Sequence, residues 1–168
     1  MIKLKDLSLQ PLSEDDKEFY FKIYSNPSLM KYITAPLTRD ESDKSFYLTL
    51  KRMSQTPAKI LLYVIVLNKT KEKIGVIGLR WNQDNSSSVE IGIIVMEKFH
   101  GTGLAHAAKK ALIQEAFDNF SIKKIIAHCE IDNQAANKAN QKLGFKKVSQ
   151  FSEVNSSIVR IKWEKINE

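Results

Sequence analysis

Residues 89–95 read Val-Glu-Ile-Gly-Ile-Ile-Val, and residues 100–105 read His-Gly-Thr-Gly-Leu-Ala. The first stretch is apolar and rich in β-branched residues, which predicts a strand. From Leu104 to Ala116 apolar residues recur at helical spacing, so the glycine-bearing turn opens a helix. Glycine permits positive φ angles and close approach of a ligand to the backbone. Because the first N–H groups of a helix have no partner within it, the turn is a candidate phosphate site.

Other phosphate-binding loops do not match this turn. A P-loop requires Gly-Lys-Ser or Gly-Lys-Thr, and a dinucleotide-binding loop requires three spaced glycines with an acidic residue about 20 positions later. Neither pattern surrounds Gly101 and Gly103. A tight turn at a helix start, with no ligand, is the remaining alternative.

Patterns on both sides of the turn predict one mixed α/β domain spanning residues 1–168. Ser13 is an expected N-cap, and Thr38 with Glu41 fits a capping box. Helices are expected after Ser13, after Thr38, from Leu104 and at 135–142, with a polar turn at 82–88. Strands are expected at residues 3–9, 60–67, 74–81, 89–95, 124–131, 145–148 and 158–163.

Composition narrows the class of protein. The net charge is +7, but basic residues are dispersed and no groove-reading motif accompanies them, which argues against nucleic-acid binding. No apolar run approaches the roughly 20 residues of a membrane-spanning helix. The single cysteine, Cys129, excludes an internal disulfide, and no metal site is expected. Residues 1–6 carry charges where a signal peptide would be apolar, so a cytoplasmic location is expected.

The turn resembles the loop Arg/Gln-x-x-Gly-x-Gly/Ala of the GNAT superfamily of N-acetyltransferases. Gly103 and Ala105 match its small positions, whereas His100 departs from the usual Arg or Gln. The resemblance covers nearly the whole chain and points to the subgroup of ribosomal-protein N-terminal acetyltransferases and spermidine acetyltransferases. Further motifs match in order: Leu9-Gln10-Pro11-Leu12, Tyr24-Ser25-Asn26-Pro27, Ile77-Gly78-Leu79, Glu90-Ile91-Gly92, and Asn133 with Leu143-Gly144-Phe145.

The resemblance implies a mixed, mostly antiparallel central sheet, splayed at the cofactor site and flanked by helices on both faces. It implies acetyl-CoA as cosubstrate. Asn133 matches a position whose side chain touches the cofactor arm, although an Asx-turn or N-cap explains it equally well. The backbone of Ile93, Ile94 and Val95 would pair with the pantetheine arm, and the pyrophosphate would lie on His100, Gly101, Thr102, Gly103, Leu104, Ala105 and His106.

The implied reaction is direct attack of a neutral amine on the thioester. An alkyl amine with a pKa of about 10.4 is almost wholly protonated at pH 7, so a general base helps. His128 and Glu90 are the two candidate bases, and an exposed polar strand face without a role is the alternative to both. The N–H of Val95 is the candidate donor to the oxyanion.

Alternation along residues 124–131 predicts the surroundings of these groups. It places His128 and Glu130 on one face with Ile126. The opposite, core face then holds Ile125, Ala127, Cys129 and Ile131, so Cys129 is expected to be buried and not a nucleophile.

The general acid is where the chain departs from the family pattern. Asn140 stands where many members have Tyr, and Ala136 where others have Ser. Asn140 donates hydrogen bonds but supplies no proton. A non-catalytic acyl-CoA-binding module is therefore the alternative function.

The acceptor is expected to be a peptide N-terminus or a small amine. Met30, Tyr32 and Ile33 are expected to line a shallow apolar slot. The resemblance also suggests a homodimer through the closing strands. A polyamine is disfavoured because the acidic residues near helix starts are expected to act as caps, namely Asp15, Asp16, Asp40, Glu41 and Asp43.

Overall fold

The computed structural model describes residues 1–82, 85–154 and 156–167. The chain divides into two compact units. The first consists of Met1–Arg80 and Gly92–Leu112, and the second of Trp81–Ile91 and Ile113–Glu168. Strand β5 (Asn85–Val95) and helix α4 (Leu104–Asn119) each contribute residues to both units.

In the first unit, neighbouring strands run antiparallel in the order β1 (Ile2–Lys3), β2 (Leu7–Pro11), β3 (Ile60–Leu67) and β4 (Lys73–Asn82). The hairpin expected from residues 60–81 is thereby confirmed. The single strand expected at residues 3–9 is wrong. The chain turns there, with the Leu4 N–H donating to the Leu7 carbonyl at 2.9 Å, so two short strands form.

Two helical segments of the first unit begin at their expected caps, Ser13 and Thr38. The one-turn 3-10 helix η1 (Glu14–Asp16) precedes α1 (Lys17–Tyr24), and Ser13 N–H donates to the Asp16 carboxylate at 2.8 Å. Thr38 and Glu41 form the expected capping box of α3 (Arg39–Met53), with Thr38 N–H donating to Glu41 at 2.8 Å. A short helix not expected from the sequence, α2 (Pro27–Met30), lies between them.

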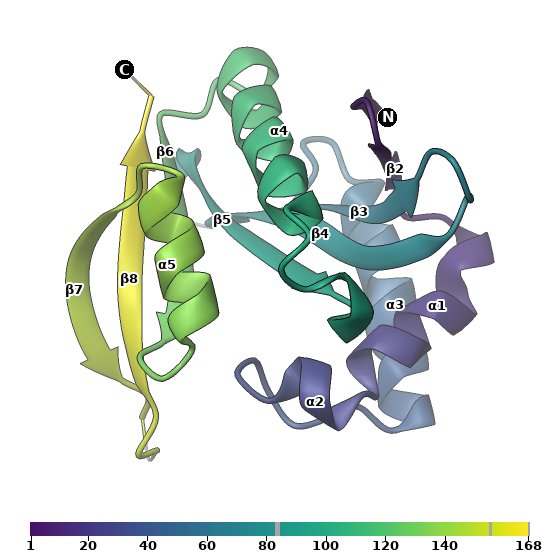
Figure 1. Ribbon diagram of the computed structural model, residues 1–168, viewed down its shortest axis with the longest axis horizontal. Coiled ribbons are helices and arrows are strands. Elements are labelled where there is room, and N and C mark those ends of the chain that lie inside the picture. The colour runs from purple at the N-terminus through teal and green to yellow at the C-terminus, as the bar shows by residue number, and fades with distance from the viewer. Residues whose placement is uncertain (83–84, 155, 168) are drawn as a thin grey trace. The chain divides into compact units, whose positions relative to one another are not determined.

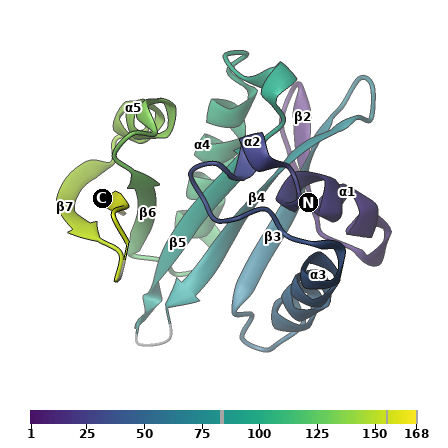
Figure 2. The same ribbon diagram turned by 90° about the horizontal axis from the view of Figure 1, so that it is seen from below.

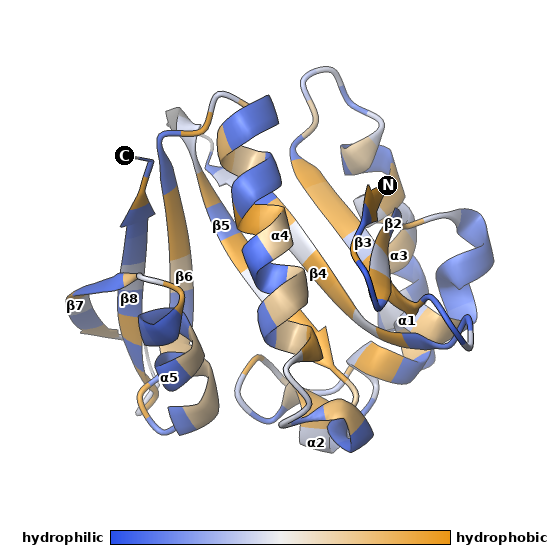
Figure 3. Cartoon of the chain, turned by 45° about the horizontal axis from the view of Figure 1, so that its top comes forward, coloured by the Kyte–Doolittle hydropathy of each residue, from blue (hydrophilic) through white to orange (hydrophobic). Residues whose placement is uncertain are grey.

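The core of the first unit lies on both faces of its sheet. Helices α1 and α3 cover one face of β3, and the first turns of α4 cover the other (Figures 1 and 2). Ile23 and Phe46 are buried in the same cluster as Val64 and Val76. Figure 3 shows the resulting hydrophobic band along β3 and β4. Coverage of both faces explains why β3 reads as a continuous apolar run.

In the second unit, the strand order is β5, β6 (Lys124–Glu130), β8 (Val159–Ile166) and β7 (Lys146–Ser152). β5 pairs with β6 in parallel, and the other neighbours are antiparallel. Helix α5 (Gln134–Lys142) contacts β6, and the indole of Trp163 on β8 donates to the Asn137 amide oxygen at 2.9 Å. The expected α/β class with mostly antiparallel strands is confirmed.

Two details of the second unit correct the sequence analysis. β5 begins at Asn85, so most of the polar turn expected at 82–88 is strand; residues 83 and 84 of that turn lie outside the described residues. β6 ends at Glu130, and the chain turns at residues 131–132. Ile131 is therefore 42% exposed instead of in the core, whereas Ile125, Ala127 and Cys129 are buried as expected.

None of the helices in the described ranges has the length and apolar character needed to cross a bilayer.

The packing of Gly75 yields a stability prediction. A Cβ at Gly75 would lie 2.3 Å from the Ile94 carbonyl oxygen, whereas a Cβ at Gly92 would meet nothing within 4 Å. Gly75→Ala should lower the free energy of unfolding by about 1–3 kcal/mol, because β4 and the end of β5 must separate. Gly92→Ala should change it by less than about 0.5 kcal/mol. Urea denaturation measures both, and equal effects would show that the close approach is not a constraint.

Candidate functional site

The end of β5 is fixed by the strand beside it and by the loop that follows it. Met96 N–H donates to the Ile74 carbonyl at 2.8 Å. The His100 Nε2 lies 2.7 Å from the Val95 carbonyl oxygen. Because a carbonyl only accepts hydrogen bonds, Nε2 carries the proton in this contact. His100, which departs from the family's Arg or Gln, thus ties the loop to Val95.

The glycine turn has the geometry of an anion site. Gly101 and Gly103 have φ angles of +74° and +82°, and a Cβ at either position would meet nothing within 4 Å. The Thr102 hydroxyl donates to the Phe99 carbonyl at 2.7 Å and holds the turn. The N–H groups of Leu104, Ala105 and His106 stand in the first turn of the 16-residue helix α4, where they have no partner within the helix. Open space above positive-φ glycines at a long helix start fits a pyrophosphate.

The two candidate bases form a hydrogen-bonded pair in the second unit. His128 Nδ1 lies 3.1 Å from Glu90 Oε1, and the two side chains are 28% and 24% exposed. The parallel register pairs Glu90 with Ile126. The His128 ring also stands edge-on to Phe151, with ring centroids 5.4 Å apart. A neutral His128 that donates from Nδ1 to Glu90 keeps the Nε2 lone pair as a proton acceptor.

Charged groups on β8 lie on the strand that pairs with the His128 strand. Lys162 is the cross-strand partner of His128, and it contacts Glu164 at 3.0 Å. Burial raises the pKa of Glu164, but hydrogen bonds from Lys162 and Lys124 outweigh burial and lower that pKa below its usual value. Glu164 is therefore ionised at neutral pH and offsets the positive charges of Lys162 and Lys124.

In the first unit, burial raises the pKa of the Tyr24 phenol, which therefore stays neutral at pH 7.

Two further sequence candidates have structural partners in the second unit. The Asn133 Oδ1 accepts from the Ala136 N–H at 3.1 Å, so the N-cap explanation of Asn133 is confirmed and its role toward a cofactor stays a prediction. Asn140 is fully buried, and its amide nitrogen donates to the Cys129 sulfur at 3.2 Å.

The structure brings together some of the predicted site residues and adds others. Residues 93–95 and 100–106 both belong to the first unit, whereas His128, Glu90, Asn133 and Asn140 belong to the second. The apolar slot expected from Met30, Tyr32 and Ile33 is wrong in part, because Met30 is 1% exposed and belongs to the core. Sequence reasoning missed Phe151, for which an exposed edge strand gave no signal.

A family model described as an acetyltransferase (GNAT) domain matches residues 6–146 of the chain. The chain belongs to the GNAT acetyltransferase family. Two relatives from Bacillus subtilis (strain 168) are both named uncharacterized N-acetyltransferases. YjdG is 30% identical over 83 residues, which are 49% of this chain and 49% of that protein. YoaA is 26% identical over 142 residues, or 84% and 80% of the two proteins. The match to YjdG thus spans about half its length.

Solved structures support the GNAT fold. Spermidine N-acetyltransferase from Vibrio cholerae, in complex with CoA and spermine, has a TM-score of 0.82 at 20% identity, over 96% of this chain and 95% of that one. RimL, a ribosomal L7/L12 alpha-N-protein acetyltransferase in complex with coenzyme A, has a TM-score of 0.84 at 18% identity, over 97% and 95%. At such identities the likeness concerns the fold alone.

Burial of Cys129 predicts that its thiol reacts slowly in the native protein. The residue is 9% exposed, and its sulfur accepts a hydrogen bond from Asn140. An aromatic disulfide reagent should therefore label the native protein at least about tenfold more slowly than the unfolded protein, because access requires opening of the core. Cys129→Ser should retain most activity in any assay that the wild type passes. Rapid stoichiometric labelling of the native chain, or loss of activity in a stable Cys129→Ser protein, would point to a reactive cysteine.

Proposed function

We propose that the chain is an N-acetyltransferase that moves an acetyl group from acetyl-CoA to a primary amine by direct attack. Family membership supports the reaction class. The hydrogen bond between His128 and Glu90 carries the catalytic part of the proposal, because a non-catalytic binding module has no need of an oriented proton acceptor. The amine is a peptide N-terminus or a small molecule.

The cosubstrate would be held mainly by backbone groups of the first unit. N–H groups of residues 101–106 would bind the pyrophosphate, and the backbone of residues 93–95 would pair with the pantetheine arm. Bound acetyl-CoA supplies the thioester carbon that the amine attacks. The Asn133 oxygen caps α5, and its amide nitrogen would be the hydrogen-bond donor toward the arm.

His128 and Glu90 divide the proton transfer between them. His128 Nε2 takes a proton from the acceptor's ammonium group, directly or through one water, and the neutral amine that results attacks the thioester. Glu90 holds Nδ1–H, fixes the tautomer and stabilises the imidazolium that forms, as a carboxylate does beside other catalytic histidines. The Val95 N–H is the proposed donor to the oxyanion. A role for Asn140 toward the leaving thiolate stays a prediction.

A non-catalytic acyl-CoA-binding module is the second candidate. The observation that favours it concerns the two positions where family members carry a general acid. Asn140 and Ala136 stand there, and neither can give up a proton: the Asn140 amide is hydrogen-bonded to the Cys129 sulfur, and Ala136 has no polar side chain. Coenzyme A binding without thiol release across peptides, polyamines and small amines would support this reading.

Several properties of the whole protein stay predictions. These are one catalytic domain over residues 1–168, a cytoplasmic location, independence from metal ions and a homodimer through β7 and β8.

Coenzyme A affinity tests the glycine turn. In Gly103→Ala the new methyl group would occupy the open space above the turn, so coenzyme A should bind at least about tenfold more weakly, or roughly 1.4 kcal/mol. Gly144→Ala is the matched control, because Gly144 has a φ of +80° at the end of α5 and suffers the same backbone strain. Titration calorimetry compares them. An equal loss of coenzyme A affinity in both variants would mean that backbone strain alone weakens binding.

The kinetics of two variants test the His128–Glu90 pair. His128→Gln should lower kcat/KM at pH 7 by at least about a hundredfold, because it removes the proton acceptor. Glu90→Gln should be milder, since it removes orientation but leaves the acceptor. If Glu90→Gln is crippling and His128→Gln is nearly silent, Glu90 is the base; if both are silent, neither takes part.

A further inference from the structure

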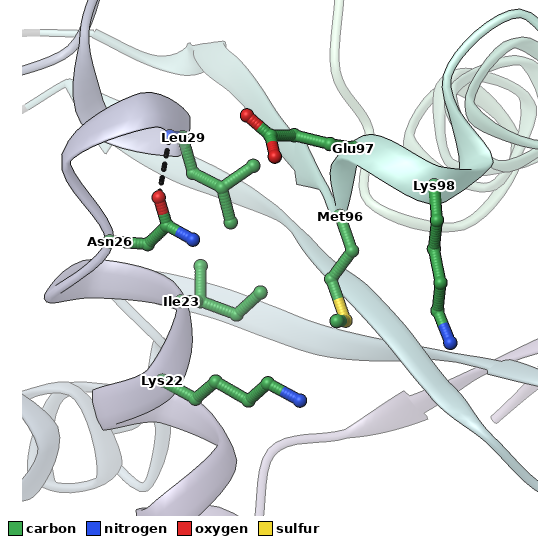
Figure 4. Close-up of a pocket in the computed structure, with 7 residues that line it drawn as sticks. All are labelled: Lys22, Ile23, Asn26, Leu29, Met96, Glu97 and Lys98. Atoms are coloured by element: carbon green, nitrogen blue, oxygen red, sulfur yellow. Dashed lines mark hydrogen bonds between the residues drawn. The ribbon is translucent and has the colours of Figure 1, made fainter.

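A cavity of about 220 Å³ in the first unit lies beside the segment that follows β5. It opens where the last turn of α1, the helix α2 and the 3-10 helix η2 (Glu97–Phe99) meet (Figure 4). Met96, which lines it, directly follows Val95 of the proposed cofactor strand. The apolar lining consists of Ile23, Leu29 and Met96, and the polar lining of Lys22, Asn26, Glu97 and Lys98.

One side of the cavity presents hydrogen-bond donors. The Asn26 Oδ1 accepts from the N–H groups of Ser28 at 2.9 Å and Leu29 at 3.2 Å, so the amide nitrogen is the part of Asn26 left toward the cavity (Figure 4). Lys22 extends its ammonium group along the same rim. Among residues 1–82, 85–154 and 156–167, no carboxylate forms an ion pair with Lys22. A cation and an amide donor favour a carboxylate ligand.

The opposite side of the cavity carries a fixed negative charge. The Glu97 carboxylate accepts a hydrogen bond from the Ser28 hydroxyl, which joins α2 to η2. Lys98 does not neutralise Glu97, because Lys98 pairs with Glu72. Figure 4 places Glu97 across the apolar side chains from Lys22. A carboxylate at this position repels a phosphate dianion and attracts an ammonium group.

We propose that this cavity binds a small zwitterion, namely an amino acid with an aliphatic side chain. Its carboxylate lies at Lys22 and Asn26, its ammonium group toward Glu97, and its side chain against Ile23, Leu29 and Met96. This ligand class accounts for both charged sides and for the apolar surface between them. That the bound amino acid is also the acetyl acceptor rests on the proposed function.

Titration calorimetry with and without coenzyme A tests the site. The probes are leucine, leucinamide without the carboxylate, 4-methylpentanoate without the amine, and inorganic phosphate. Leucine should bind at least about tenfold more tightly than leucinamide, since the charge pair with Lys22 is lost. Lys22→Met should remove this preference, and Lys51→Met, at an exposed lysine of α3, should not. Glu97→Gln should weaken the binding of leucine but not the binding of 4-methylpentanoate, which has no ammonium group.

Three outcomes would overturn the site: leucinamide binding as tightly as leucine, phosphate binding in preference to leucine, or no leucine binding in either state.

An acetylation assay separates the site from the proposed function. Wild-type protein should acetylate leucine with a higher kcat/KM than leucinamide, and Lys22→Met should reverse that order through KM. If leucinamide is the better acceptor of the wild type, the acceptor assignment fails while the acetyltransferase proposal stands. If leucine binds in a Lys22-dependent manner but no amine is acetylated, the site stands and the proposed function fails.

Discussion

The close approach of Gly75 to the backbone of Ile94 and Val95 is the constraint on which the functional part of the first unit depends. With no side chain at Gly75, β4 lies against the end of β5 at a distance that a Cβ would prevent. This contact fixes where β5 ends, and the bond from His100 to the Val95 carbonyl then fixes where the loop begins. Met96, which lines the cavity, and the glycine turn both follow Val95 in the chain.

Local signals in the sequence predicted this part of the fold well, because the interacting groups are close along the chain. Thr38 and Glu41 are three residues apart, and their capping box depends on little else. The turn at Gly101 and Gly103 is equally local, since glycine content and the helix that follows define it. A local signal misleads where packing between distant elements decides: the sequence predicts Met30 as a slot residue, but packing from other elements buries it.

The pairing of Glu90 with His128 could not be predicted from the sequence. Strand alternation identified His128 as polar within an apolar strand, whereas the family resemblance pointed to Glu90, and the two residues were rival candidates for one role. Their contact depends on the parallel register of β5 and β6, which joins residues 38 positions apart. Register between distant strands is set by the whole sheet, and no local pattern encodes it. The structure thus shows that the two candidate bases are hydrogen-bonded to each other.

The division of roles proposed for His128 and Glu90 bears on the missing general acid. In the proposed reaction the tetrahedral intermediate expels either the thiolate or the amine that attacked. A thiol with a pKa of about 8.5 leaves as an anion far more readily than an alkyl amine, whose conjugate acid has a pKa of about 10.4 and whose departure as an anion is harder still. Once the nitrogen has lost its proton, breakdown therefore proceeds toward product without help from an acid. In the proposed reaction, proton removal from the amine is then the step that needs the protein, and the role proposed for the His128 ring is to accept that proton.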